Sequence, residues 1–445
     1  MKKLNLPLVL IVLIFLPFIS LGQGIDGTTY PGNGTTYYGL NVGVGGSNST
    51  HFGENAGRIS TAKYNTFLGN NAGYSNTTGT YNLFVGYNSG YNNMSGGENV
   101  FLGNGSGRGN ISGQNNVFVG SSSGTTNTTG RRNVFVGHQS GRRNTEGIYN
   151  TFLGAGAGAN NISAHYNVFI GTFSGSYNTV GSRNVFNGYY SGFSNTTGYE
   201  NVFTGSHSGV MNTEGRYNIF TGYKSGTNNT TGNSNIFIGA SSGISNSTGE
   251  GNIIIGHLAG AKMISGSKNV FIGHNAGRYE LGSNRLYIDN SSTRTPLIYG
   301  QFDTDQVGIN TNDIPAGYSL AVKGKMITEE VKVKLYASGW PDYVFNKNYH
   351  LPTLKDVENH IKEKGHLKNI PSAKEVAENG ILLGDMNAKL LQKIEELTLY
   401  TIEQEKKLQT QEKQLKEQEK TNQELQARLL KIEKLLLNQQ PVTSN

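Results

Sequence analysis

The chain has 445 residues, of which 62 are glycine, none is cysteine and only 15% are charged. The lack of cysteine excludes a disulfide framework, a thiolate metal site and a lipid-anchored cysteine. The formal net charge is +7, but the ten basic and five acidic residues between positions 65 and 277 are scattered along the chain. Nucleic-acid-binding domains usually carry a dense basic stripe, so we expect no nucleic-acid partner.

The N-terminal segment has the organisation of a secretory signal peptide. Two lysines precede an apolar run (residues 6–21) that ends in small residues. A membrane anchor is the alternative, but Pro7 and Pro17 interrupt a run that is already short for a membrane span. We therefore predict a signal peptide at residues 1–22, export of the protein, and no transmembrane span once the signal is removed.

The body of the chain is a tandem repeat with a constant period of seventeen. Each copy begins with Asn-x-Phe-x-Gly, with one Phe replaced, and no residue is inserted between copies. Degenerate copies at residues 51–57 and 284–290 flank the array, as expected for the end caps of a stack. We assign residues 23–64 to an N-terminal cap with a degenerate repeat and residues 65–290 to the repeat array. The regular copies begin at Asn65, Asn82, Asn99, Asn116, Asn133, Asn150, Asn167, Asn184, Asn201, Asn218, Asn235, Asn252 and Asn269.

The repeat predicts an all-β solenoid, a parallel β-roll with one coil per copy. Each copy reads N-x-F-x-G-x-x-[SA]-G-x-x-N-x-[ST]-G-x-x, with a few departures. Its short apolar run alternates with polar flanks and is too short for a helix, and its three glycines predict turns with positive φ. Coils about 4.8 Å apart would stack the phenylalanines into a rod roughly 60 Å long. The predicted core ladder is Phe67, Phe84, Phe101, Phe118, Phe135, Phe152, Phe169, Phe186, Phe203, Phe220, Phe237 and Phe271.

The phrase N-x-F-x-G-x-x-[SA]-G resembles the head repeats of YadA-like trimeric autotransporter adhesins, over about residues 43–290. The resemblance implies a left-handed parallel β-roll that assembles as a homotrimer. It also implies an extracellular location, or one on the outer surface of a Gram-negative bacterium. The implied partners are the surface of a host or neighbouring cell, or a polysaccharide.

The variable positions leave several surface interpretations open. Asn-x-Thr/Ser triplets, such as those at Asn76, Asn127 and Asn195, match glycosylation sequons, but a turn whose Asn and Thr cap backbone groups is favoured. The thirteenth position forms a Thr-rich column that could order water, as in ice-binding solenoids, although Met and Ile in the same column indicate a packed or inward edge. That column reads Thr77, Met94, Ile111, Thr128, Thr145, Ile162, Thr179, Thr196, Thr213, Thr230, Ser247 and Ile264.

Tyrosine and histidine recur at other variable positions. Exposed tyrosine beside Asn and Ser suits contacts with sugars or proteins, although tyrosine also simply fits a pleated surface. The tyrosines concerned are Tyr74, Tyr81, Tyr87, Tyr91, Tyr149, Tyr166, Tyr189, Tyr190, Tyr217 and Tyr223. The histidines have no column of carboxylates beside them, so we predict no metal site, no cofactor and no catalytic site. They are His138, His165, His207, His257 and His274.

Residues 291–339 read as strands that form a stalk or linker after the array. The segments VGINT and SLAVKGK, within residues 307–325, resemble the stalk that precedes C-terminal chaperone domains in phage tail-fibre-like proteins. Residues 340–384 then predict two short helices. Thr353 begins the first and Gly365 ends it, and a Ser-x-x-Glu capping box at Ser372 begins the second, which ends at Gly380.

The C-terminal block as a whole is similar to the tailspike intramolecular chaperone family. Active members of that family cut themselves at a Ser-Asp junction with a Ser-Lys arrangement, and the module drives trimerisation. The present chain contains no Ser-Asp dipeptide. The resemblance therefore implies a trimerisation module, with self-processing only as an alternative.

Residues 385–438 predict a long helix that forms a parallel coiled coil. Its heptads are apolar at both ends and carry Gln at three successive d positions in the middle, and the charges at g-to-e′ spacing favour parallel chains. The predicted oligomerisation residues are Ile394, Leu397, Leu408, Leu415, Asn422, Leu425, Leu429 and Ile432.

These patterns predict a secreted or surface-displayed, trimeric, fibrous protein that binds surfaces, glycans or other cells through its repetitive head, and that is not an enzyme. A tail-fibre-like protein with a C-terminal chaperone that trimerises, and in some forms processes itself, is the first alternative. A structural spacer or an ice-binding solenoid is the further alternative.

Overall fold

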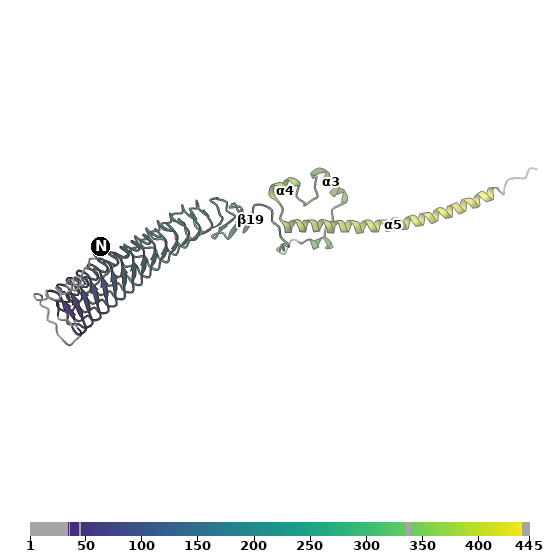
Figure 1. Ribbon diagram of the computed structural model, residues 1–445. Helices are drawn as coiled ribbons and strands as arrows, with labels where there is room; N and C mark the ends of the chain where they lie inside the picture. Colours follow the sequence, from purple (N-terminus) through teal and green to yellow (C-terminus); the bar gives the residue numbers. More distant parts are fainter. Residues whose placement is uncertain (1–33, 35, 44–45, 335–339, 438–445) are drawn as a thin grey trace, which may run out of the picture. The chain divides into compact units, whose positions relative to one another are not determined.

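The computed structural model of the chain contains two compact units. It describes residues 34, 36–43, 46–334 and 340–437, so the predicted signal peptide lies outside the described residues. The first unit ends at Met326 and the second begins at Ile327. All described strands belong to the first unit and all described helices to the second (Figure 1).

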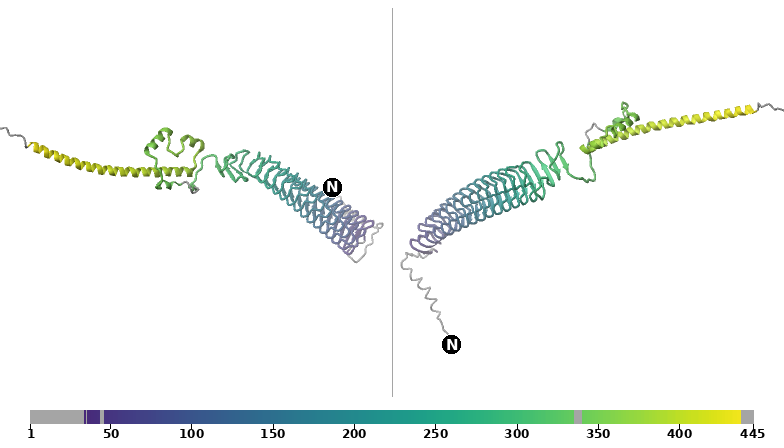
Figure 2. Two further views of the ribbon diagram at one scale, coloured as in Figure 1. Left: turned by 180° about the vertical axis from the view of Figure 1, so that it is seen from behind. Right: turned by 90° about the horizontal axis from the view of Figure 1, so that it is seen from above.

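Each coil of the first unit contributes one short strand. From β1 to β16 neighbouring strands run parallel, and each residue pairs with its counterpart in the next coil. The middle residue points inward and its neighbours outward, as the two-residue period of a strand requires. The predicted solenoid, with one coil for each copy of the repeat, is confirmed (Figure 2). The strands are β1 (Thr36–Tyr38), β2 (Thr50–Phe52), β3 (Thr66–Leu68), β4 (Leu83–Val85), β5 (Val100–Leu102), β6 (Val117–Val119), β7 (Val134–Val136), β8 (Thr151–Leu153), β9 (Val168–Ile170), β10 (Val185–Asn187), β11 (Val202–Thr204), β12 (Ile219–Thr221), β13 (Ile236–Ile238), β14 (Ile253–Ile255), β15 (Val270–Ile272), β16 (Arg285–Ile288), β17 (Ile298–Gln301), β18 (Gln306–Ile309) and β19 (Leu320–Val322).

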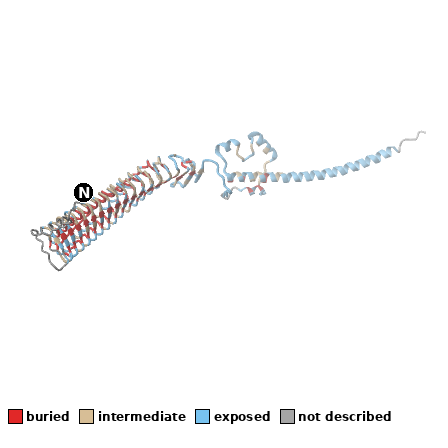
Figure 3. Cartoon of the chain, in the orientation of Figure 1, coloured by how far each residue is buried: buried red, intermediate tan, exposed pale blue. Residues whose placement is uncertain are grey.

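A phenylalanine ladder fills the interior of the coils, which Figure 3 colours as buried. All twelve predicted ladder residues are fully buried. Adjacent rings lie nearly parallel, with centroids 4.8 Å apart both from Phe118 to Phe135 and from Phe135 to Phe152. This distance equals the strand spacing of a sheet, so each coil adds one ring to the stack. Ile254 occupies the one place in the regular array where the phenylalanine is replaced.

The degenerate copies continue the ladder at both ends. His51 of β2 takes the phenylalanine place and stacks on Phe67, with ring centroids 4.7 Å apart. Tyr287 of β16 contacts Phe271 edge to face at 5.4 Å. A further coil, β1, pairs Tyr37 with His51, and the step between these two residues is shorter than the period of the array. The sequence pattern did not indicate this coil, because its spacing departs from that period.

The recurring asparagines at the first and twelfth positions form two ladders inside the rod. At the first position, the backbone N–H of Asn133 donates to Oδ1 of Asn116 at 3.0 Å, and its side-chain amide donates to the carbonyl of Gly147 at 2.8 Å. At the twelfth position, Asn144 donates to Oδ1 of Asn127 at 2.7 Å. These buried amides link successive coils and satisfy one another's polar groups. The sequon asparagines belong to the second ladder. Asn127 also donates to the carbonyl of Gly130, three residues further on, at 3.0 Å, so the predicted capping of a turn by Asn is confirmed.

Two of the three recurring glycines have the predicted positive φ, and the third, which Ala164 replaces in one copy, does not. Gly137 has φ 133° and Gly141 has φ 56°. The prediction is wrong for Gly147, whose φ lies outside that region. Gly147 is glycine because of close packing, since a Cβ there would lie 2.2 Å from Oδ1 of Asn144. Positive φ occurs instead at the seventh and seventeenth positions, which are rarely glycine.

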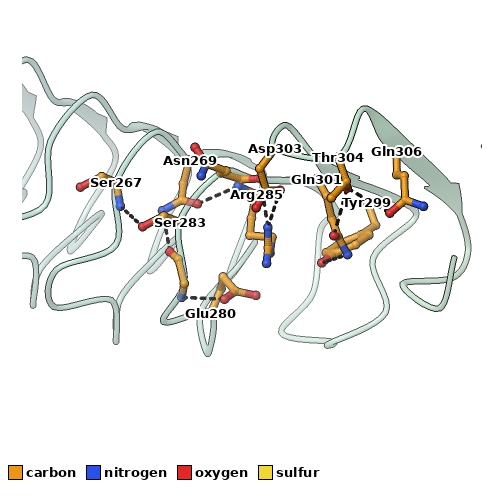
Figure 4. Close-up of polar contacts among 12 residues, drawn as sticks. Ser267, Asn269, Glu280, Ser283, Arg285, Tyr299, Gln301, Asp303, Thr304 and Gln306 are labelled. Atoms are coloured by element: carbon orange, nitrogen blue, oxygen red, sulfur yellow. Dashed lines mark hydrogen bonds and ion pairs between the residues drawn. The ribbon is translucent and has the colours of Figure 1, made fainter. Parts of the chain in front are cut away.

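The end of the array changes from parallel to antiparallel pairing. Strand β17 pairs antiparallel with both β16 and β18, and β19 then pairs parallel with β18. The backbone N–H of Arg285 donates to Oδ1 of Asn269 at 2.9 Å, and its guanidinium pairs with Asp303 at 3.2 Å (Figure 4). The first asparagine ladder thus continues into β16. The predicted strands after the array are confirmed as far as β19.

The second unit holds a short 3-10 helix, η1 (Pro341–Phe345), and three helices. Thr353 and Ser372 each make a complete capping box at the start of α3 and α4, and Gly365 and Gly380 follow their last residues, as predicted. The long helix α5 begins two residues before the predicted start at Asp385 and packs against η1. The helices are α3 (Leu354–Lys364), α4 (Ala373–Asn379) and α5 (Leu383–Leu437).

Candidate binding surface

The strands present an apolar ribbon along the outside of the rod. The ribbon consists of the second and fourth repeat positions, which are the outward residues of β3 to β15. Most are Val, Ile or Leu, and many are more than a third exposed, for example Leu153 at 46% and Ile219 at 41%. Polar residues interrupt one edge of the ribbon at Asn187, Thr204 and Thr221. Soluble monomers rarely expose contiguous apolar patches larger than a few hundred Å². The ribbon is therefore a candidate interface.

A second surface is made by the turn segment that follows each strand. We call it the basic–aromatic face and define it as repeat positions six, seven, ten and eleven from Arg58 to Tyr279. Its aromatic residues are Tyr74, Tyr87, Tyr91, Phe173, Tyr177, Tyr189, Tyr190, Phe193, Tyr223 and Tyr279. Its cations are Arg58, Arg108, Arg142, Arg143, Lys224, Lys262 and Arg278. Four of these cations lie over a tyrosine ring of the same face, with centroid distances from 4.7 to 5.8 Å.

Four successive coils of this face join their rings into one aromatic cluster. Tyr190 is at its centre, with ring centroids 4.5 Å from Tyr189, 4.7 Å from Phe193 and 5.7 Å from His207. Desolvation by the neighbouring rings, together with Tyr189, raises the pKa of Tyr190. The cluster consists of Phe173, Tyr177, Tyr189, Tyr190, Phe193, His207 and Tyr223.

The ten predicted surface tyrosines divide between this face and another part of the coil. Tyr81, Tyr149, Tyr166 and Tyr217 lie at the seventeenth position, where Tyr149 and Tyr166 stack with centroids 5.1 Å apart. The other six lie on the basic–aromatic face. The sequence identified the residues but did not show this division, because the path of the coil decides which positions share a side.

The Thr-rich column at the thirteenth position faces outward, with its threonines half-buried and its Met and Ile residues exposed, so the expected packed or inward edge is wrong. Met94, Ile111, Ile162 and Ile264 are between 42% and 60% exposed. The threonine hydroxyls donate to a backbone carbonyl of the next coil, as Thr196 does to Thr213 at 3.0 Å. The threonine side chains of the column therefore link successive coils on the outside of the rod. Their hydroxyl protons are donated to backbone carbonyls and are not available to order water.

The histidines offer one close pair. His257 and His274 stack with their Nδ1 atoms 3.3 Å apart, and the neighbouring Asn290 side chain accepts the backbone N–H of His274. Among the described residues there is no group of three or more His, Asp or Glu side chains placed to hold a metal ion.

The predicted oligomerisation residues lie along α5 and are exposed (Figure 3). Ile394 and Leu397 line a groove of about 580 Å³ between α3 and α5, with Val357 on its other wall. Below the groove, the hydroxyl of Tyr349 donates to Oε1 of Glu396 at 2.6 Å. The helical unit thus fixes the first turns of α5 through polar contacts and leaves the heptad residues uncovered.

No family model, curated protein or solved structure matches this chain. None of the described helices is both long and apolar enough to span a membrane.

Proposed function

We propose that this chain is an exported, adhesin-like fibrous protein that binds surfaces through the outer faces of its solenoid. The observation that carries the proposal is the uninterrupted array, in which the same outward positions recur at each 4.8 Å step of the stack. Weak contacts made by one coil can be repeated by its neighbours, and linked weak contacts give high avidity. The resemblance of the repeat to YadA-like adhesin heads agrees with this role.

We infer that three chains associate, and two exposed apolar surfaces support self-association. The heptad positions of α5 form a stripe of large apolar side chains, such as Leu415 at 60% and Leu429 at 59% exposed. A heptad stripe of this kind is normally buried against partner helices in a coiled coil. The apolar ribbon of the rod is a second surface that copies of the same chain would cover.

The tail-fibre-like alternative is supported by the helical unit. Within this unit η1 packs against α5 and α3 faces α5 across the groove, which suits a module that aligns chains at one end of a coiled coil. In this alternative the module assembles the trimer, and the absent Ser-Asp dipeptide argues against self-cleavage. The ice-binding alternative is weakened by the threonine hydroxyls, which donate to backbone carbonyls.

Attachment of coated particles tests the proposed function. Beads that carry the full-length protein should adhere to bacterial or host cells, whereas beads coated with an unrelated protein of equal charge should not. Light scattering of the same preparation should give the mass of three chains. If the coated beads adhere to no cell or matrix while the protein is still a trimer, the adhesive function is wrong and the structural-spacer role is favoured.

A further inference from the structure

The excess positive charge of the array lies on one side of the coils. Between residues 65 and 277, five of the ten basic residues and none of the five acidic residues occupy the basic–aromatic face. The other five basic residues share positions fourteen to seventeen with all five carboxylates. On that side Arg183 pairs with Glu200 at 3.1 Å. No cation of the basic–aromatic face is in an ion pair within residues 46–334, all of which are described.

We propose that the basic–aromatic face binds an acidic polysaccharide, with the aromatic cluster as its anchor. The proposal rests on the proposed adhesive function and names the ligand class for it. Cations without carboxylate partners attract a polyanion, and tyrosine supplies a rigid apolar ring with a polar tip. Pyranose rings have apolar C–H faces that stack on such rings, and their hydroxyls bond the polar tips.

The cluster is pre-organised for a ligand, because its rings hold one another. The ring of Phe193 contacts those of Tyr190 at 4.7 Å and Tyr177 at 4.9 Å. The Phe173 ring lies against Gly156 of the preceding coil, where a Cβ would come within 2.6 Å of it. Side chains already fixed in the free protein lose little entropy on binding.

The cluster also differs from the rest of the array in the residues at its seventh position. The seventh position has positive φ in every regular coil, and elsewhere in the array it is often Asn, Gly or Ser. In four successive coils it is instead Phe173 (57°), Tyr190 (56°), His207 (59°) and Lys224 (55°). Bulky residues are uncommon in this conformation. The seventeenth position also carries them, for example Tyr149 and Tyr166 at 59°, so the mutual ring contacts of the cluster, and not φ alone, distinguish these coils.

The spacing of the cations fits a polysaccharide better than a nucleic acid. Arg142 and Arg143 lie two coils before the cluster and Lys224 lies in its last coil, so about five coils or 24 Å separate these cations. Over the whole face there is roughly one cation for every 10 Å of rod. A nucleic-acid strand carries a phosphate about every 3.4 Å. The sparser spacing of the cations is closer to that of an acidic polysaccharide, whose charges are separated by whole sugar units.

Binding of full-length protein to alginate, a polymer of uronic acids, and to neutral dextran tests the proposal. Alginate should bind about tenfold more tightly than dextran, and its affinity should fall as salt is added. Equal binding of the two polymers would overturn the acidic specificity. Tighter binding of a single-stranded oligonucleotide than of alginate would assign the face to nucleic acid instead.

Matched variants locate the site. The double variant Tyr189→Ser/Tyr190→Asn uses residues that occur naturally at these two positions in other coils, so the coil is retained. It should weaken alginate binding about tenfold, as loss of a central aromatic contact does. The control Tyr149→Asn/Tyr166→Asn removes a stacked pair with the same positive φ from the seventeenth position. Its affinity should stay within about twofold of the parent.

A second pair of variants tests the charges. Arg142→Gln/Arg143→Gln should weaken alginate binding and reduce its salt dependence, whereas Arg131→Gln/Arg132→Gln removes the same charge from the other side of the coil and should not. Equal loss in both pairs would mean non-specific attraction and would overturn the site. If coated beads adhere to cells but the protein does not bind alginate, this proposal fails while the proposed function stands. If neither is observed, both fail.

Discussion

The solenoid and the helical unit differ in where their apolar side chains lie. In the solenoid, the phenylalanine ladder is fully buried within a single chain. In the helical unit, the largest apolar side chains of α5 stay exposed, and the described part of α5 buries only Gly384, Ala388, Glu395 and Glu396 (Figure 3). A coil finds its packing partner in the next copy of its own repeat. A single long helix has no such neighbour.

This difference separates two sources of stability. Repeat proteins gain stability from contacts between adjacent repeats, so the rod should remain folded at any protein concentration. An isolated helix gains little from propensity alone, and most helical stability comes from packing of its apolar face. The helical unit should therefore depend on association, and the rod should not.

The largest expected effect comes from charges in the heptad stripe. Leu425→Asp/Leu429→Asp places carboxylates at a d and an a position, and we expect it to abolish association. Burying an unpaired charge and losing a packed leucine together cost at least about 3 kcal/mol per chain. Light scattering should report monomers, and circular dichroism should report loss of helix with the β signal unchanged.

The control lies one residue further along the same helix. Leu430 is as exposed as Leu429 in the single chain, at 59% each, but it lies outside the a and d positions. Leu430→Asp should therefore keep the oligomer. If Leu430→Asp dissociates the protein as completely as the double variant, the heptad register is wrong.

The next effect concerns the interior of the rod. Phe152 is fully buried, with neighbouring ring centroids at 4.8 Å on both sides. Phe152→Ala should lower the free energy of unfolding by about 3–5 kcal/mol, because it leaves a cavity between two rings. Denaturant unfolding of the β signal measures this loss. Phe152→Ile, which copies the natural Ile254, should cost clearly less, and no change of association is expected in either variant.

Much of the fold could be predicted from the sequence, because the constraint repeats. A phenylalanine that recurs at a constant interval predicts a stack without knowledge of its exact path, and the capping boxes at Thr353 and Ser372 are local signals. Other features depend on that path. The turns at the twelfth position could be predicted, but the asparagine ladders between coils could not, because a turn asparagine has the same sequence signature with or without a ladder. Strand β1 was missed because its spacing differs from the period of the array.

The candidate site was less predictable than the fold. The tyrosines were identified one by one, but the aromatic cluster exists only because positions six, seven, ten and eleven share a side of the coil. The exposure of Met94 and Ile111 shows the converse error, since apolar identity indicated an inward edge. Residue type alone could not show that Met94 and Ile111 point outward. The phenylalanines already fill the core of each coil, so these apolar side chains are left on its surface.

A smaller effect tests the end of the ladder. His51 is buried in the N-terminal end of the stack, and this burial lowers its pKa from 6.5 to about 4, although a hydrogen bond to the carbonyl of Gly43 opposes the shift. Between these two pH values, His51 is therefore protonated in the unfolded chain and neutral in the folded chain. Stability should be full above pH 6.5 and fall by about 3 kcal/mol as the pH drops to 4.

Hydrogen exchange of β2 and β3 at pH 7 and pH 4.5 measures this loss where it acts. Only the N-terminal coils should open at the lower pH, since the phenylalanine ladder that continues from His51 does not titrate. His51→Phe, which restores the residue found in regular copies, should remove the pH dependence. Persistence of the effect in His51→Phe would assign it to another group.

The smallest expected effect lies on the outside of the rod. The Thr196 hydroxyl donates to the carbonyl of Thr213 at 3.0 Å, but that carbonyl also accepts the backbone N–H groups of residues 196, 197 and 198. Thr196→Val should therefore cost only about 0.5–1 kcal/mol, since the acceptor stays satisfied. Thr197→Val, one residue away on the exposed surface, should be neutral within about 0.5 kcal/mol. Thermal unfolding compares the two variants. If Thr196→Val lowered the free energy of unfolding as much as Phe152→Ala does, the outer hydroxyl column would stabilise the rod as much as the buried phenylalanine ladder. The contrast between the interior and the surface of the rod would then be wrong.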